Sequence, residues 1–153
     1  MSIWIGVDPG SRSGAYAIIT ENGVTVKPWD NDVFCADMRN IAFDIESHKE
    51  KAIAVVEKVG AIRGQGLTST WSFGKNAGFI EGCLSALRIS FQLVPPKKWK
   101  SEYSLSSDKA KSIEVCHRLF PNVSLRRTDK CRTDDNNFAE AVLMAEYARR
   151  KYR

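Results

Sequence analysis

The first 20 residues contain the feature that most constrains how this chain can fold. The apolar run of residues 3–7 ends in Asp8, and a second apolar run follows over residues 14–20 after a Pro-Gly pair. A run that is apolar at consecutive positions is typical of a strand buried on both faces. An unpaired carboxylate at the tip of such a strand is costly. Asp8 is therefore a candidate site residue held by a rigid element.

The rest of the chain alternates between strand and helix patterns. The predicted strands are residues 2–8, 14–20, 23–29, 52–59 and 90–96. The predicted helices are residues 32–50, 67–88, 107–120 and 137–152, the third capped by Ser106 or Ser107. An Asn-Gly turn joins the second and third strands, so the first three strands form an antiparallel meander. This order predicts an α/β fold: a mixed five-stranded sheet with helices on its faces, in a single domain over residues 1–153.

Composition and charge limit the class of protein. The chain of 153 residues is 43% hydrophobic and 27% charged, as in ordinary globular proteins, and its formal net charge is +5. No apolar stretch has the length of a membrane span, and the N-terminus does not resemble a signal peptide. The four cysteines have neither metal-site spacing nor a compact disulfide pattern. We therefore expect a cytoplasmic protein with reduced thiols, and the positive charge favours a polyanionic partner.

A second acid ends the fourth predicted strand. Glu57 follows the apolar run of residues 52–56, just as Asp8 follows its own run. If the intervening helix is a crossover, the first and fourth strands are parallel neighbours in the sheet. Both carboxylates then emerge at one edge, where open α/β sheets place their sites. Each acid alone is equally well explained as a strand end that meets solvent, but the pair indicates a site.

Further acids lie around the start of the last predicted helix. Glu140 stands between two alanines in a part of the helix that is expected to pack tightly, so it requires a cationic neighbour. Asp134 and Asp135 come just before the first turn, where an acid can also serve simply as a helix cap. Carboxylates from remote segments are stable together only with cations between them, and hard oxygen ligands select Mg²⁺ or Mn²⁺. Such a site suits two-metal phosphodiester cleavage.

Four stretches of the chain resemble RuvC-type Holliday junction resolvases, particularly the compact forms carried by phages. They are "IGVDPGSRSGAYAI", "VVEKVGAIRGQGLTSTWSFGKNAGFIEGCL", "LVPPKKWKSEYSLSSDKAKSIEVCHRLFP" and "FAEAVLMAEYARR". The resemblance implies an RNase H-like fold, a homodimer, and two Mg²⁺ or Mn²⁺ ions per active site that cleave four-way or other branched DNA by paired nicks. By position, Asp8 and Glu57 match the first two acids of the family, and Glu140 matches the last.

The chain departs from the family pattern at the third acid. The family often has an aspartate three or four residues before the last acid, where this chain has Asn136 and Asn137. The nearest carboxylate is Asp135, which we expect to be the metal ligand, with Asp134 behind it. Some relatives also carry an aromatic wedge just after the second acid, where this chain has Gly60. Either Ile62 or a residue of the following loop substitutes for it, or the wedge is missing.

Basic residues agree with a DNA partner. Lys100 and Lys109 match lysines that the family places near the scissile phosphate, and we expect Lys109 to be catalytic. The expected DNA-binding residues are Arg63, Lys75, Lys97, Lys98, Lys100, Lys109 and Lys111.

The middle helix carries more apolar residues than one sheet face needs. The apolar positions are Trp71, Phe73, Phe79, Ile80 and Leu84. They form either the core or, because a four-way junction has two-fold-like symmetry, the interface of a two-fold dimer.

Two other functions fit parts of the pattern. A strand-tip Asp followed by Gly also occurs in the phosphate loops of actin- and hexokinase-like ATPases, but those proteins need a second lobe for which 153 residues leave no room. The asparagines at the third acid also allow a branched-DNA-binding module that has lost catalysis. A Mg²⁺-dependent nicking assay on a synthetic four-way junction separates the three functions.

Overall fold

The computed structural model describes residues 1–152, and its centre is a mixed five-stranded sheet. The strands are β1 (Ser2–Asp8), β2 (Ala15–Thr20), β3 (Gly23–Pro28), β4 (Lys51–Glu57) and β5 (Ser90–Val94). Their order across the sheet is β3-β2-β1-β4-β5. The meander β1–β2–β3 is antiparallel, and β4 is parallel to both β1 and β5. The predicted mixed sheet and its central pair of parallel strands are confirmed.

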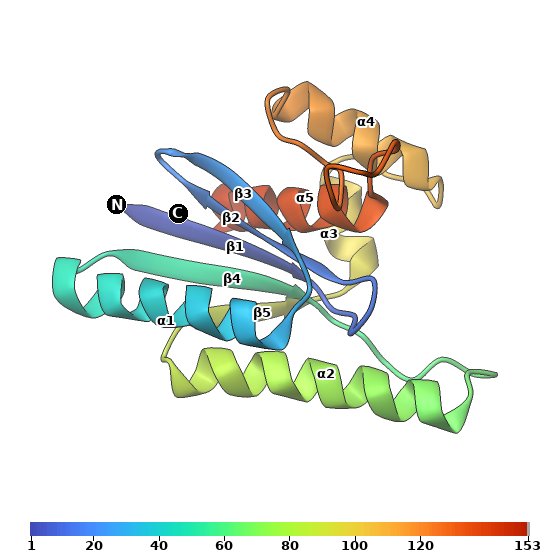
Figure 1. The fold of residues 1–153 in the computed structure, drawn as a ribbon, viewed down its shortest axis with the longest axis horizontal. Coiled ribbons are helices and arrows are strands. Elements are labelled where there is room, and N and C mark those ends of the chain that lie inside the picture. The colour runs from blue at the N-terminus through green and yellow to red at the C-terminus, as the bar shows by residue number, and fades with distance from the viewer. Residues whose placement is uncertain (153) are drawn as a thin grey trace.

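Helices cover both faces of this sheet, as predicted. They are α1 (Asn31–His48), α2 (Leu67–Ala86), α3 (Pro96–Glu102), α4 (Lys109–Leu119) and α5 (Asn136–Lys151). Figure 1 shows α1 and α2 below the sheet and α5 directly above it, with α4 beyond α5. None of the helices within residues 1–152 combines the length and apolar character needed to cross a bilayer.

The upper layer brings α5 into unusually close contact with β1. All residues of α5 from Phe138 to Ala148 are buried, Glu140 and Glu146 included. A Cβ atom at Gly6 of β1 would overlap the backbone of Ala141 and Ala145. Glycine at this position therefore lets the helix lie directly on the central strand. This contact fixes where the first turns of α5 meet the carboxyl edge of the sheet.

The lower layer is a separate apolar core. The other face of β1 packs against Phe34 and Met38 of α1 and against Ile80 and Leu84 of α2. Ile80 and Leu84 are fully buried in this core, so they are not available to a second subunit. Of the apolar residues predicted on α2, Trp71 is the exposed one, with 75% of its surface accessible.

Two local predictions were wrong. The sequence pattern does not predict the helix α3, because Pro95 and Pro96 stand at the end of the predicted strand of residues 90–96. A proline in the first helical turn is compatible with helix geometry, and Pro96 is the first residue of α3. The cap of α4 is Asp108, whose side chain accepts a hydrogen bond of 3.0 Å from the amide of Ala110, and not Ser106 or Ser107.

Candidate active site

Asp8 and Glu57 lie side by side at the carboxyl edge of the sheet. Val7 of β1 is in register with Val56 of β4, so the next residue on each strand is an acid. Asp8 is 7% exposed, and its Oδ2 atom has no hydrogen-bond partner among the described residues. The predicted juxtaposition of these two carboxylates is confirmed, and Asp8 has the buried, unpaired oxygen that a cation would satisfy.

Glu140 contributes a third carboxylate, from α5. It is 8% exposed. Lys100, on α3, reaches it with an Nζ–Oε1 distance of 3.3 Å. The cationic neighbour expected for Glu140 is therefore this lysine, which comes from a helix on the same side of the sheet.

The electrostatics join these groups into one cluster. Burial raises the pKa of Asp8 to about 8, and the nearby carboxylates of Glu57, Glu140 and Asp135 add to the increase while Lys100 opposes it. Burial also raises the pKa of Glu57, and Glu140 adds to that effect. A carboxylate with a raised pKa is one whose charged form lacks stabilisation. A bound cation would therefore stabilise this cluster.

The indole of Trp99 supports Glu57. Its Nε1 donates a hydrogen bond of 2.8 Å to Oε2 of Glu57, which works against the rise in the pKa of that carboxyl. The Trp99 side chain is fully buried, although it lies between two lysines in sequence. The sequence analysis singled out the lysines of this stretch and gave Trp99 no role. A tryptophan between lysines is the sequence signal that could have indicated a buried position here.

Asp135 caps α5 and is itself tightly held. Its Oδ1 accepts the amide hydrogens of Asn137 and Phe138, and its Oδ2 accepts a hydrogen bond of 2.9 Å from Nε of Arg127. Burial alone would raise the pKa of Asp135, but these hydrogen bonds and the charge of Arg127 outweigh it and lower the pKa. Its charge still acts on Asp8. Asp135 is thus the cap of α5, and its predicted role as a metal ligand stays a prediction.

Asp134 is engaged elsewhere. Its Oδ2 lies 2.7 Å from Nε2 of His117 on α4. His117 was not among the predicted site residues. The structure pairs it with Asp134 and leaves Asp135 as the aspartate whose charge acts on Asp8.

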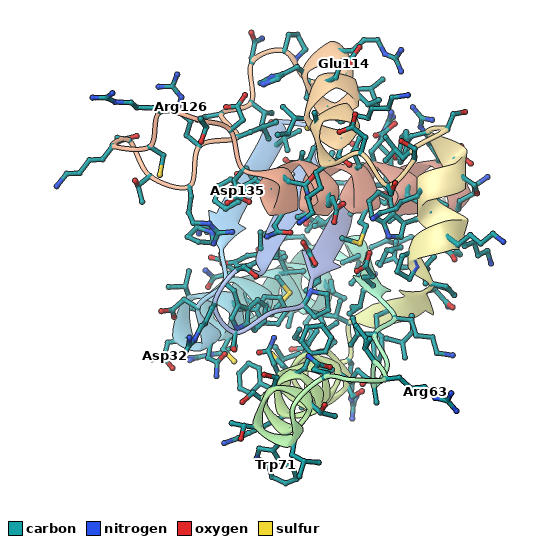
Figure 2. The ribbon with its side chains drawn as sticks, turned by 90° about the vertical axis from the view of Figure 1, so that its right-hand side faces the viewer. Asp32, Arg63, Trp71, Glu114, Arg126 and Asp135 are labelled. Carbon is teal, nitrogen blue, oxygen red and sulfur yellow. The ribbon has the colours of Figure 1, made fainter. Side chains whose placement is uncertain are left out.

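The predicted DNA-binding residues divide into two groups. Lys97, Lys98 and Lys100 lie on α3, and Lys109 and Lys111 lie in the first turn of α4, all on the same side of the sheet as α5. Arg63 and Lys75 belong to the loop before α2 and to α2 itself, on the other side of the sheet. Figure 2, a view toward the carboxyl edge, shows Asp135 above the strand ends and Arg63 below them. Within residues 1–152, only Lys100 of these seven residues forms an ion pair.

The donor chemistry of the cluster fits a hard divalent cation. Asp8, Glu57 and Glu140 offer carboxylate oxygens, and the orphaned Oδ2 of Asp8 is a ready acceptor. Within residues 1–152, no three acidic, histidine or cysteine side chains converge closely enough to form a complete ligand set. The ligand set is therefore not fully assembled in the conformation described, in which Lys100 stands beside Glu140.

Comparison with solved structures shows the fold. RuvC of T. thermophilus in complex with a Holliday junction substrate is 12% identical and superposes with a TM-score of 0.61, over 99% of this chain and 97% of the RuvC chain. A second Thermus thermophilus RuvC structure is 9% identical, with a TM-score of 0.55 over 97% and 95%. This is a RuvC-like, RNase H-like fold. No family model matches the chain, and no curated protein matches its sequence.

Proposed function

We propose that this protein is a metal-dependent endonuclease that resolves four-way or other branched DNA junctions by paired nicks, in one nuclease domain that spans the chain. The observation that carries the proposal is the buried Asp8, with an unpaired carboxylate oxygen, beside Glu57 and Glu140 at the carboxyl edge of a RuvC-like sheet. The fold neighbour that was solved with a Holliday junction supports the choice of substrate. The site of action would be the cytoplasm, of a bacterial host if the protein is the compact phage form.

The ions would be held by four carboxylates, those of Asp8, Glu57, Glu140 and Asp135. Asp134 is the alternative to Asp135 as the fourth ligand. Two Mg²⁺ or Mn²⁺ ions bound there would supply an activated water and a stabilised leaving oxygen. The protein's own part is to hold the carboxylates on rigid strand ends and a helix. Trp99 fixes Glu57, and burial limits the access of bulk water to Asp8.

The lysines of α3 and α4 would position the DNA. Lys100 is close enough to the acids to contact a phosphate beside the cut once it leaves Glu140. Lys109 would stabilise negative charge in the transition state, and the start of α4 adds the positive end of its helix dipole. Lys97, Lys98 and Lys111 would contact the flanking arms. Arg63 and Lys75, on the other side of the sheet, would meet DNA farther from the cut, near Ile62, which is 69% exposed.

The proposed homodimer would place two such sites on one junction. A two-fold dimer matches the near two-fold symmetry of a four-way junction and explains cuts made in pairs. The face of α2 that points away from the sheet is the proposed contact. Figure 2 shows Trp71 at the bottom of the molecule, on the far side of α2 from the sheet.

A second candidate is a branched-DNA-binding protein of the same fold with weakened catalysis. The observation that favours it is the set of hydrogen bonds that occupies both oxygens of Asp135. If Asp135 is a ligand, Asp135→Asn lowers the single-turnover nicking rate at least ten-fold more than Asp134→Asn does. Equal and mild effects of both substitutions would mean that the site works with Asp8, Glu57 and Glu140 alone.

The test of the main proposal is a nicking assay on a synthetic four-way junction with and without Mg²⁺. We expect paired nicks that require the metal. Asp8→Asn and Glu57→Gln should abolish cleavage and leave junction binding intact or tighter, because they remove metal coordination and negative charge together. Binding by the wild type without any cleavage would favour the second candidate, and wild-type rates in Asp8→Asn would reject the assignment of the site.

A further inference from the structure

The segment between α4 and α5 is a long loop with an excess of positive charge. Residues 126–132, RRTDKCR, contain four cationic side chains and one acidic side chain. None of them belongs to the basic residues that the sequence assigned to DNA. We call residues 120–135 the arginine loop. Its exposed cations are Arg126, Lys130 and Arg132.

The arginine loop is anchored at two points. Leu125 is 1% exposed in the upper core, and its carbonyl accepts a hydrogen bond from the amide of Asp135. Arg127 turns inward: besides Asp135, its guanidinium donates to the carbonyls of Ser13 and Gly14 at 2.8 and 3.2 Å. It also stacks over the ring of Phe138, with 5.0 Å to the ring centroid. The loop is thereby fixed against the β1–β2 turn, next to the strand end that carries Asp8.

The remaining cations of the loop face solvent. Arg126, Lys130 and Arg132 are exposed, and none forms an ion pair within residues 1–152. Asp129, the acid of the same stretch, likewise forms no ion pair with them in this part of the chain. Arg12, exposed in the β1–β2 turn that Arg127 clasps, adds a fourth cation to the same surface. The contacts of Arg127 anchor the loop, while Arg126, Lys130 and Arg132 stay exposed to a partner.

The arginine loop and α3 lie on opposite sides of the acid cluster. In Figure 2, Arg126 lies on one side of Asp135, and α3 with its lysines lies on the other side, beyond the strand ends. The acid cluster is therefore flanked by cations on both sides. A single track of lysines would serve one duplex arm, whereas cations on two sides of a site can hold two arms that diverge from it.

We propose that the arginine loop and Arg12 form a second DNA contact, which binds the phosphates of a duplex arm on the side of the site opposite α3. The inference rests on the proposed function and adds to it the surface that receives the second arm. Arg126, Lys130 and Arg132 neutralise phosphates, and each arginine can bind phosphate oxygens in a bidentate manner. Arg127 is the positioning residue that ties this contact to Asp135.

The test compares two triple variants of the full chain. The loop variant is Arg126→Gln, Lys130→Gln and Arg132→Gln. The control variant is Arg39→Gln, Lys49→Gln and Arg88→Gln, which removes the same charge at exposed positions away from the loop. Arg39 lies on α1, Lys49 follows α1 and Arg88 follows α2. Binding to a synthetic four-way junction is measured over a series of salt concentrations, and single-turnover nicking is measured with enzyme in excess.

We expect the loop variant to bind the junction at least ten-fold more weakly at about 100 mM salt. Its slope of log K against log salt should flatten by roughly 2 to 3 units, since each lost phosphate contact removes about 0.9. The saturated nicking rate should stay at the wild-type value, and the control should bind like the wild type. Equal affinities of the two variants would overturn the proposed second DNA contact but not the proposed nuclease function. A wild type that binds no branched DNA would overturn both.

Discussion

At the scale of the residue, the decisive feature is a carboxylate whose charge is unfavourable until a cation arrives. Asp8 is buried and near three other acids, and Lys100 compensates for only part of this charge. The metal-free protein therefore contains stored electrostatic repulsion, which metal binding relieves. Two residues make this testable: Asp8 itself, and Trp99, which supports its neighbour Glu57.

The stability of the metal-free protein should fall as the pH rises. The pKa of Asp8 is about 8 in the folded chain, against 3.8 for an ordinary aspartate, so between these values the folded state binds more protons than the unfolded state. The free energy of unfolding then decreases with pH across this window. Asp8→Asn removes the effect. In chelator, we expect the variant to gain about 1–3 kcal/mol over the wild type between pH 5 and pH 9, measured by urea unfolding. A difference that is the same at both pH values would contradict the burial of this charge.

Trp99→Phe should disturb the site without removing any proposed ligand. The substitution keeps a buried aromatic ring but deletes the N–H group that donates to Glu57. Because that hydrogen bond lowers the pKa of Glu57, its loss should raise the pKa and make metal binding weaker at low pH. We expect the pH–rate profile of nicking to move to higher pH and the Mg²⁺ concentration for half-maximal activity to rise several-fold. Trp4→Phe, at a half-buried tryptophan near the start of β1, is the control and should leave both unchanged.

At the scale of the element, the strands and their acids could be predicted, and the contacts between distant side chains could not. Asp8 and Glu57 follow from local patterns, because two apolar runs of similar length end in acids and a crossover makes them parallel neighbours. The partner of Asp135 is Arg127, which also reaches across to the β1–β2 turn, and no periodicity encodes such a bond. Trp99 and Glu57 are 42 residues apart in sequence, and their hydrogen bond follows from no local pattern either. The helix α3 was missed because a proline both ends a strand and begins a helix.

The contact between α5 and β1 allows a direct test at this scale. Gly6→Ala places a methyl group against the backbone of Ala141 and Ala145 and 3.0 Å from the carbonyl carbon of Met144. Backbone cannot move aside as a flexible side chain does, so α5 must shift away from the strand. We expect a loss of about 2–3 kcal/mol in the free energy of unfolding, and lower nicking activity because Glu140 moves with the helix.

Gly78→Ala is the matched control for this substitution. Gly78 lies on the exposed face of α2, where an added Cβ meets no atom within 4 Å. Alanine favours helix over glycine by about 1 kcal/mol, so this change should leave the monomer equally stable or more stable. If both substitutions had the same effect on stability, close packing of α5 on β1 would not be the reason for a glycine at position 6.

At the scale of the whole molecule, the open face of α2 is the feature that one copy of the chain leaves unexplained. Leu67 and Trp71 are 90% and 75% exposed on this helix, and Gly74, Gly78 and Gly82 continue the same face at intervals of four residues. Exposed apolar side chains beside small residues allow two helices to approach closely. Our proposal of a homodimer predicts that this face is covered in solution.

Trp71→Glu should convert the proposed dimer into a monomer. A charge at the centre of an apolar helix contact loses its hydration without gaining a partner, so the dimer is penalised while the free monomer, in which position 71 faces water, is not. Sedimentation equilibrium should give a mass near 17.2 kDa for the variant and twice that for the wild type. Phe43→Glu, at an aromatic of α1 that is 63% exposed, is the control and should remain a dimer.

On a four-way junction, the monomeric variant Trp71→Glu should make single, uncoupled nicks in place of paired ones, since each copy then carries one site to the DNA. A wild type that sediments as a monomer, or a Trp71→Glu variant that still cuts in pairs, would show that two copies do not meet through α2.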